Sequence, residues 1–515
     1  MTFFPLDPAS RDTIPLFDVA AVRRIEHAAQ ASLPPFTLMS RAGAAAADWL
    51  AAHAPDGLWL LLAGPGNNGG DALVAATRLH LTGRHVEVWL TGDPARLPPD
   101  ASRAHAEAVA AGVPLHQVAD DTTPWPRGCT AIVDGLLGIG LNRPAEGAMA
   151  RWIGRLTDDA PPVYALDIPS GLNADTGAGE PAVRARRTLT FIGAKPGLLT
   201  LDGRDCAGDI DIAPIGLPYP PPEPASATVN TPAGFSPWLP VRRHAVNKGT
   251  FGTLAVIGGS AGMTGAPLLG ARAALLLGAG RVHIGFLADP APQIDPVHPE
   301  LMLHAADTIA LASLNAIVLG PGMGTGAGAR THLARLLAEA AALHTPPTLV
   351  LDADALNLLA ADKSLATALM RSKLPRVMTP HPLEAARVLG SNVADVQRDR
   401  LAAAHALAAQ WQSVVVLKGS GTVIAAPGEP PAINPTGNAA LATAGTGDVL
   451  AGMAGALLAQ GMPPRAAAQA AVWIHGRAAD HLVASGIGPA GVTAGELYPP
   501  ARRIFNALLR GDSAA

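Results

Sequence analysis

Two glycine-rich loops, each containing one aspartate, limit most strongly how this chain can fold. The first is Gly64–Asp71 (Gly-Pro-Gly-Asn-Asn-Gly-Gly-Asp), and the second is Ala444–Asp448 (Ala-Gly-Thr-Gly-Asp). Each adjoins a strand-like apolar run and opens a helix-like one, so backbone N–H groups at a helix start can face an oxygen-rich ligand beside a carboxylate. Because the loops differ in sequence and surroundings, we expect two separate active sites.

Short apolar runs alternate with helix-like stretches along most of the chain. This alternation predicts parallel sheets, with ligands at the carboxyl ends of the strands. A single core rarely exceeds about 250 to 300 residues, so 515 residues predict two α/β domains. The expected strands are Leu58–Ala63, Val86–Leu90, Ala131–Val133, Val163–Leu166, Thr253–Ile257, Ala316–Leu319, Thr348–Leu351, Arg376–Met378 and Ser413–Leu417. The expected helices include Val19–Ala31, Phe36–Ala52, Asp71–Leu81, Ala266–Leu277 and Val449–Gln460.

A proline-rich stretch separates the two expected domains. It includes Pro218–Pro224, and proline can continue neither a helix nor a strand ladder. We therefore expect residues 218–240 to form a semi-rigid linker between a first domain, 1–217, and a second domain, 241–510.

The composition excludes several classes of protein. With 49% hydrophobic and 15% charged residues the chain is globular, and a net charge of -4 offers no electrostatic footprint for nucleic acid. Met1–Arg11 lacks a basic region followed by an apolar one, and the apolar helices are interrupted early, so we expect neither export nor a membrane span. Cys129 and Cys206 are too few for a disulfide framework and lack metal-ligand spacing, which favours the cytoplasm.

The first loop formally matches the dinucleotide-binding pattern G-x-G-x-x-G. Asp71, however, is expected in the first helical turn, where a carboxylate repels a pyrophosphate. The ribose-binding acid expected about 20 residues on should end the next strand, whereas Glu87 lies inside that strand. An NAD-dependent dehydrogenase is therefore the weaker interpretation.

Polar residues follow several strands of the first domain. Asn67–Asn68, Asp134 and Asp167–Gly171 should meet at the carboxyl ends of the strands. Amide, carboxylate and hydroxyl oxygens suit a hard cation, and with so few carboxylates an alkali ion is at least as plausible as a divalent one. The structural alternative is that the aspartates cap loops and the asparagines form a tight turn. Spacing alone supports both interpretations equally.

The first domain resembles the YjeF amino-terminal family, the NAD(P)H-hydrate epimerases with a Rossmann-like three-layer fold. The resemblance spans most of residues 15–217 and depends on Gly64–Asp71, Asp134–Leu141 and Leu166–Gly177. It implies that Asp167 is the catalytic acid or base, since inverting a carbon that bears a hydroxyl requires proton transfer. The potassium ligands that it implies are Asn68, Asp134 and Ser170. The implied substrate-binding residues are Asn67, Asn68, Gly69, Gly70, Asp71, Gly138, Ile139, Gly140, Leu141, Asn142, Arg143, Pro144 and Asp167.

The second loop precedes an apolar helix, so its N–H groups and the helix dipole can stabilise a phosphoryl group in transfer. Asp448 could accept a proton from an attacking alcohol, or merely cap the helix. Lys418 ends a strand and precedes Gly419–Thr422, which excludes a Walker A loop because the glycines there come before the lysine. His381 could be structural or functional. Lys195 and Lys418 both lie near glycines, where an ammonium suits a phosphate or carbonyl oxygen, with chance placement as the equal alternative.

The second half resembles the YjeF carboxy-terminal family, the NAD(P)H-hydrate dehydratases with a ribokinase-like fold. The resemblance covers about residues 245–500. The motifs that carry it are Lys248–Gly252, Gly258–Ser260 with Gly265–Pro267, Gly320–Gly324, Asp352–Asn357, Thr379–Pro382 and Ala444–Asp448. It implies an ADP site made by Lys418, Gly419, Ser420, Gly421, Thr422 and Gly447. It also implies a hydrate site made by Ala266, Gly322, His381 and Asp448, with Asp448 as the base.

Together the two resemblances imply a bifunctional repair enzyme. The first domain would interconvert the R and S hydrates of NADH and NADPH, and the second would phosphorylate the S hydrate with ADP and Mg²⁺ and then eliminate phosphate. The residues do not distinguish ADP from ATP. One rival is a ribokinase-like vitamin or sugar kinase whose phosphoester persists, and another is a noncatalytic first domain. We expect these small molecules as partners, no nucleic acid or membrane, and a homo-oligomer.

Overall fold

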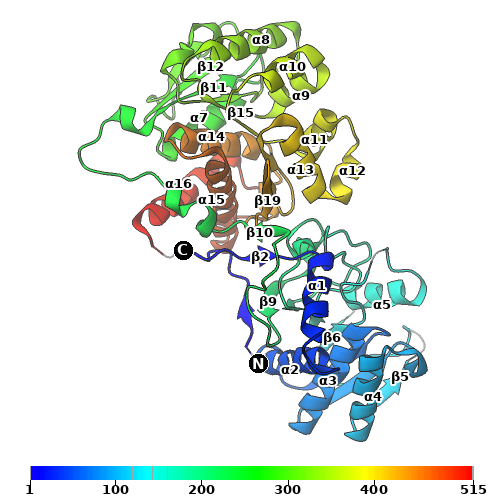
Figure 1. The fold of residues 1–515 in the computed structure, drawn as a ribbon. Helices are drawn as coiled ribbons and strands as arrows, with labels where there is room; N and C mark the ends of the chain where they lie inside the picture. Colours follow the sequence, from blue (N-terminus) through cyan, green and yellow to red (C-terminus); the bar gives the residue numbers. More distant parts are fainter. Residues whose placement is uncertain (1, 119–120, 142, 159, 513–515) are drawn as a thin grey trace. The chain divides into compact units, whose positions relative to one another are not determined.

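The computed structural model describes residues 2–118, 121–141, 143–158 and 160–512 (Figure 1). The chain divides into two compact units. The first contains Met1–Asp7 and Ile14–Thr228, and the second contains Pro8–Thr13 and Val229–Ala515. Each unit is built on a sheet rich in parallel strands, so the predicted α/β class is confirmed for both.

The sheet of the first unit has the strand order β1-β9-β8-β7-β6-β3-β4-β5. β1 runs antiparallel to β9, and the other neighbours pair in parallel. The chain builds outward from β3 in one direction and then, from β6, in the other, and ligands bind where such a sheet turns back. The strands are β1 (Phe4–Pro5), β3 (Leu58–Ala63), β4 (Val86–Leu90), β5 (Leu115–Gln117), β6 (Cys129–Gly135), β7 (Val163–Leu166), β8 (Arg187–Phe191) and β9 (Asp209–Ala213).

Helices cover both faces of this first sheet. Side chains alternate along a strand, and in β3 Leu61 packs with α2, α3 and α4 whereas Leu60 packs with α5. β3 is apolar throughout because both of its faces are buried. The expected three layers are therefore present. The helices are α1 (Val19–Gln30), α2 (Thr37–His53), α3 (Asn67–Leu81), α4 (Pro99–Ala110), α5 (Gly147–Asp158) and α6 (Gly203–Cys206).

The sheet of the second unit runs in parallel from β13 through β12, β11, β14, β15 and β16 to β17, and continues antiparallel through β18 and β19. Its strands are β11 (Thr253–Gly258), β12 (Arg281–Phe286), β13 (Met302–Ala305), β14 (Ala316–Leu319), β15 (Thr348–Leu351), β16 (Arg376–Met378), β17 (Val414–Leu417), β18 (Val423–Ala426) and β19 (Glu429–Ile433). The carboxyl ends of the central parallel strands carry the predicted motifs.

Helices also cover both faces of the second sheet. In β11, Val256 packs with α7, α14, α15 and α16, while Ile257 packs with α8, α9, α11 and α13. The helices are α7 (Gly265–Leu276), α8 (Ala327–Ala342), α9 (Ala353–Ala361), α10 (Lys363–Arg371), α11 (Pro382–Leu389), α12 (Val393–Arg398), α13 (Arg400–Trp411), α14 (Thr446–Ala459), α15 (Pro464–Ala484) and α16 (Tyr498–Arg510). In the described part of the chain, no helix has the length and apolar character needed to cross a membrane.

The stretch expected to be a linker is partly folded. It includes β10 (Ala227–Val229) and short 3₁₀ helices at Pro232–Gly234 and Ser236–Trp238. Phe235 is completely buried, and the Asn230 side chain donates hydrogen bonds to Asn434 Oδ1 and Gln469 O, both at 3.0 Å. Residues 229–240 thus pack into the second unit and are not a solvated spacer, because the apolar and amide side chains after the prolines find buried partners.

Candidate active sites

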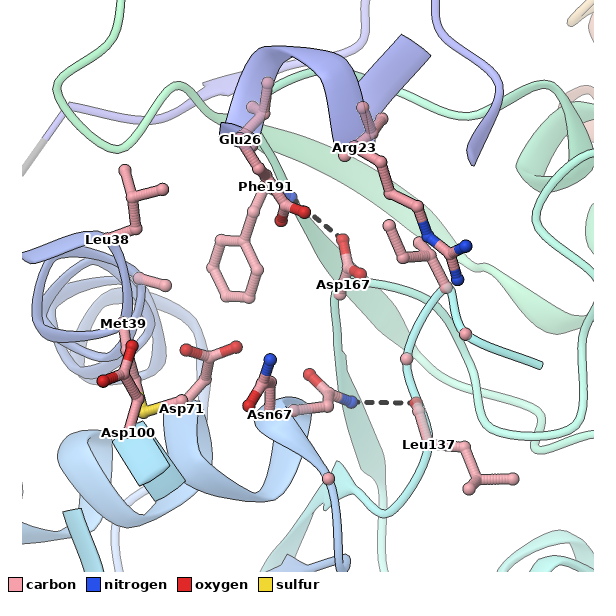
Figure 2. A pocket seen from close by; sticks show the side chains of 18 of the residues that line it. Arg23, Glu26, Leu38, Met39, Asn67, Asp71, Asp100, Leu137, Asp167 and Phe191 are labelled. Carbon is pink, nitrogen blue, oxygen red and sulfur yellow. Dashed lines mark hydrogen bonds between the residues drawn. The ribbon is translucent and has the colours of Figure 1, made fainter. Parts of the chain in front are cut away.

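A cavity of about 490 Å³ lies where the first sheet turns back (Figure 2). Its walls come from α1, α2, α3 and α4 and from the loops that follow β3, β6, β7, β8 and β9. The predicted residues that line it are Asn67, Asn68, Asp71, Gly138, Ile139, Gly140, Leu141 and Asp167. Arg143 and Pro144 are exposed and do not line it, and Asn142 lies outside the described residues.

Gly69 and Gly70 also lie outside the cavity lining, because they allow close packing instead. A Cβ atom on Gly69 would lie 2.0 Å from the carbonyl oxygen of Gly64, and one on Gly70 would lie 2.6 Å from the Met39 side chain. Both distances are sterically impossible. The two glycines let α3 start directly after β3, close to α2.

The structure corrects the expected start of α3. The helix begins at Asn67, so the asparagine pair forms its first turn and not a tight turn, and Asp71 lies one turn further along than predicted. The helix can start at Asn67 because Gly69 fits against Gly64 and Gly70 fits against Met39. Asp71 still lines the cavity, and burial together with the nearby Asp167 and Glu26 raises its pKa well above the usual value.

The three predicted cation ligands belong to one buried network. The Ser170 hydroxyl donates to Asp134 Oδ1 at 2.6 Å, and the Ser170 N–H donates to Asp134 Oδ2 at 2.8 Å. Asn68 donates through Nδ2 to the carbonyl oxygens of Leu137 and Leu166, at 2.8 and 3.1 Å. Asn68 Oδ1 is buried without a hydrogen-bond partner among the described residues. Burial raises the pKa of Asp134, opposed by its bonds from Ser170.

Asp167 is held by a lysine that the residue patterns did not assign to the site. Lys195 is fully buried, and its Nζ lies 2.5 Å from Asp167 Oδ1. Asp167 follows β7 with a left-handed backbone, φ 64°, which a non-glycine residue seldom adopts. A Cβ atom on Gly138 would lie 3.6 Å from Asp167 Oδ2, so that oxygen borders the loop after β6. Figure 2 shows Asp167 and Asp71 reaching the same space from different elements.

In the second unit, Lys418 directly follows β17 and lies among carboxylates, one of which directly follows β15. Its Nζ is 2.8 Å from Asp352 Oδ1 and 3.9 Å from Glu384 Oε2. Thr379 also donates to Asp352 Oδ1, at 2.8 Å. Although burial opposes the charge, these carboxylates raise the pKa of Lys418, so the ammonium remains protonated at neutral pH.

His381 has a structural role, which was one of the two interpretations of this residue: it caps a helix. Its Nδ1 accepts hydrogen bonds from the N–H groups of Leu383 and Glu384, and Glu384 Oε2 accepts from the N–H of His381, so the pair caps α11. The neutral ring therefore carries its proton on Nε2, which lies 3.3 Å from Glu384 Oε1. Burial and the nearby Lys418 lower the pKa of His381.

Asp448 lies in the first turn of α14. The N-cap is Gly445, φ 89°, without a side-chain cap, so the alternative that Asp448 merely caps this helix is wrong. The uncapped first turn presents N–H groups suited to an anion. A Cβ atom on Gly447 would lie 3.5 Å from Lys418 Nζ, which places that cation beside the helix start. Burial and the nearby Asp352 raise the pKa of Asp448 to about 7.

The predicted nucleotide loop, Lys418–Thr422, is the turn between β17 and β18. Gly419 and Gly421 have positive φ of 137° and 61°, and the Thr422 hydroxyl donates to Gly419 O at 3.1 Å. The buried Arg400 supports the loop by donating to the carbonyl oxygens of Leu417 and Lys418.

Gly322, in the loop after β14, approaches Ala266 at the start of α7: a Cβ atom on Gly322 would lie 3.2 Å from the Ala266 Cβ. α7 packs against the first turn of α14, since a Cβ atom on Gly270 would lie 3.0 Å from Asp448 O. That these residues form one hydrate site stays a prediction.

Two family models match the chain, one to each half. YjeF-related protein N-terminus matches residues 35–197, and NAD(P)H-hydrate dehydratase matches residues 254–497. The bifunctional NAD(P)H-hydrate repair enzyme Nnr of Escherichia coli is 37% identical over 92% of this chain and 90% of its own length. The chain belongs to the family of bifunctional NAD(P)H-hydrate repair enzymes.

A further relative and a solved structure are similar to the second half of the chain. The ADP-dependent (S)-NAD(P)H-hydrate dehydratase of Neisseria meningitidis is 49% identical over 51% of this chain and 88% of its own length. A solved ADP/ATP-dependent NAD(P)H-hydrate dehydratase from Bacillus subtilis, crystallised with ATP and Mg²⁺, is 32% identical, with a TM-score of 0.46 over 53% of this chain and 95% of its own.

The two sites also contain charged groups that were not among the predicted site residues. They include Arg23, Glu26, Asp100, Lys195, Asp352 and Glu384. Lys195 and Asp352 had a local signal, since one lies near a glycine and the other directly follows an apolar strand. Glu26 and Glu384 look like ordinary helix residues, and only the fold brings them to the sites.

Proposed function

We propose that the first unit interconverts the R and S hydrates of NADH and NADPH. The second unit dehydrates the S hydrate at the expense of ADP, giving NAD(P)H, AMP and phosphate. The observation that carries this proposal is a single relative, named as a bifunctional repair enzyme, that aligns with 92% of the chain and thus with both units. Each unit also has a carboxylate near a lysine: Asp167 lies beside the buried Lys195, and Asp448 lies near the partly buried Lys418.

In the first unit, Asp167 exchanges a proton with the hydrated ring while the hydroxyl-bearing carbon inverts. The Asp71 carboxyl, whose pKa is raised by burial and by the nearby Asp167, is a second group in the same cavity that can exchange a proton. Glycine at 138 and 140 lets the ring approach the backbone of the loop after β6.

Asn68, Asp134 and Ser170 would hold K⁺. The buried, unpartnered Asn68 Oδ1 fits this ion, because a buried amide oxygen without a donor needs another positive partner. Carboxylate and hydroxyl oxygens of Asp134 and Ser170 complete a hard donor set. When bound, K⁺ would supply positive charge beside the cavity that Asn68 lines.

In the second unit, the oxygen of the hydrate's ring hydroxyl attacks the β-phosphorus of ADP, and AMP leaves. Asp448 takes the proton of that hydroxyl. The N–H groups at the start of α14 and the Lys418 ammonium stabilise the transferring phosphoryl group. The C–O bond then breaks as phosphate departs, and loss of a proton from the neighbouring carbon restores the ring double bond.

Within the described ranges, no group of three or more His, Cys, Asp or Glu side chains is arranged to hold a metal ion. The described residues therefore offer no such cluster of side chains as a preformed Mg²⁺ cage. Mg²⁺ retains water and binds through phosphates, so we propose that it arrives with ADP.

A recovery assay tests this function directly. Purified chain is mixed with R and S NADH hydrates and supplied with ADP, with ATP or with no nucleotide, while NADH absorbance is followed. We expect full recovery with ADP and none without nucleotide. A stable phosphorylated product without NADH would show a kinase instead, and recovery of only the S portion would show that the first unit is not an epimerase.

The dehydration rate should depend on pH through Asp448. As a base, Asp448 must be ionised, and the ionised fraction falls tenfold per pH unit below its pKa of about 7. We therefore expect kcat/KM for the S hydrate to fall below about pH 7 and to level off above it, measured by NADH recovery. Burial also raises the pKa of Glu384, so the variant Glu384→Gln is the control. It should show the same fall in kcat/KM at low pH as the wild type. A flat profile would contradict the role of Asp448.

Removing K⁺ should lower both epimerisation and stability of the first unit. At about 100 times its Kd, K⁺ would stabilise the fold by about 2.7 kcal/mol relative to tetramethylammonium buffer. Thermal melting should show this gain in the wild type but not in Ser170→Ala. The control variant Thr188→Val should keep the gain, because the Thr188 hydroxyl lies elsewhere, on β8, and donates to Ala207 O. Equal melting temperatures in both salts would exclude the proposed ion.

We also place the enzyme in the cytoplasm. Cys129 and Cys206 are free, and burial raises the pKa of the Cys206 thiol to about 11, which keeps it unreactive. Self-association stays a prediction, which light scattering of the purified chain can check.

A further inference from the structure

The first cavity contains one buried cation, Lys195, that no step of the proposed epimerisation uses. It lies just after β8, its side chain is completely buried, and it lines the cavity beside Asp167. An ammonium is removed from water at such a position only when acceptors replace the water.

The hydrogen bonds of Lys195 account for all three of its protons. Nζ donates to Asp167 Oδ1 at 2.5 Å, to the Thr190 hydroxyl at 2.8 Å and to Phe191 O at 2.9 Å. A lysine ammonium has three donors and no acceptor capacity. No proton of Lys195 therefore remains for a substrate, so the side chain acts on the neighbouring carboxylate.

The bonds to Asp167 are unequal between its two oxygens. Oδ1 accepts from Lys195 and, at 3.4 Å, from the Phe191 N–H. Oδ2 lies 3.6 Å from the Cβ position of Gly138, on the side of the loop after β6 that lines the cavity. The carboxylate is thus fixed through one oxygen and presents the other.

The other charged side chains that line the cavity are mostly acidic. Glu26 comes from α1, Asp71 from α3 and Asp100 from α4, and all three line the cavity. Arg23 is the other cation in the lining. In Figure 2 the labelled carboxylates surround the space on several sides. Lys195 is therefore the cation bonded to Asp167 in a cavity lined mostly by acids.

We propose that Lys195 is a positioning residue: it fixes the Asp167 carboxylate through Oδ1 and reserves Oδ2 for the substrate. This inference rests on the proposed epimerase function of the first unit. A lysine in this role affects turnover rather than substrate affinity, and it acts only through Asp167.

A double-mutant cycle tests the proposal on the full chain. Lys195→Met should lower the kcat of epimerisation about 100-fold and change KM less than about threefold, because it disturbs the reacting carboxylate and not binding. Asp167→Asn with Lys195→Met should be no slower than Asp167→Asn alone, since the lysine acts through that carboxylate. A rise in KM at constant kcat, or a double variant slowed by the product of the two single effects, would overturn the proposal.

Melting temperatures provide a readout that does not need activity. Each single variant leaves one buried charge unpaired and should melt earlier, whereas the double variant removes both charges and should recover much of the loss. Independent, additive losses would overturn the ion pair. If the variants show this coupling but the wild-type chain does not epimerise hydrates, the proposed function is refuted and the ion pair is retained.

Two milder variants cover the case in which Lys195→Met does not fold. Thr190→Val removes one acceptor of the ammonium and should lower kcat about fivefold without changing KM. Thr188→Val, the same change on the same strand outside the cavity, should leave kcat unchanged. Equal kcat values for the two variants would count against the proposal.

Discussion

Asp448→Asn is expected to abolish NADH recovery from the S hydrate while R and S hydrates still interconvert. The amide cannot take the hydroxyl proton, and loss of a general base costs about 10²- to 10⁴-fold in rate. Recovery of NADH absorbance with ADP measures the first activity, and chromatography of the hydrates measures the second. Because the side chain sits in the first turn of α14 without capping it, the change should leave the fold intact.

A matched control for Asp448→Asn is Asp362→Asn. Asp362 also lies at a helix start, where it caps α10, and asparagine caps helices equally well. This variant should dehydrate at the wild-type rate. Retention of dehydration in Asp448→Asn would require another base, and loss of both activities in a folded protein would show that the two sites are not independent.

Asp167→Asn is expected to have the opposite effect. Epimerisation should fall about 10²- to 10⁴-fold because the proton-transfer group is lost, while the second unit continues to consume the S hydrate. In a mixture, NADH recovery should therefore stop once the S portion is used, and added wild-type protein should restore the remainder.

The exposed Asp209 on β9 supplies the control for this second prediction. Asp209→Asn removes a carboxylate from the same unit away from the cavity, so full recovery should persist. Complete recovery by Asp167→Asn at the wild-type rate would show that another residue transfers the proton.

Several strands were predictable because they are mostly apolar. β3, β4, β7, β14, β15 and β16 have the bounds that the sequence predicts, as expected where both faces of a parallel sheet are buried. β8 and β9 were not predicted. Their alternating Thr188, Thr190, Asp209 and Asp211 hide the strand signal, since these polar side chains are buried or bonded only in the folded sheet.

The candidate sites were predictable to the extent that their chemistry is written in short motifs. The loops at 64–71 and 444–448 contain Asp71 and Asp448 within a few residues of the glycines that shape them. Glu26 and Lys195 lie far from these motifs in the chain. Glu26 is on α1, and Lys195 follows β8. Pairing a lysine with one particular aspartate depends on strand order, which no local pattern encodes.

The amino-acid sequence by itself determined the α/β class and the positions of the two glycine-rich motifs, because these follow from the alternation of apolar strands and helices along the chain. Tertiary structure alone decided which charges stand together. Ion pairing and desolvation depend on distances of a few ångströms between segments remote in the chain, so the Lys195–Asp167 pair and the raised pKa of Asp448 appear only once the sheets are assembled.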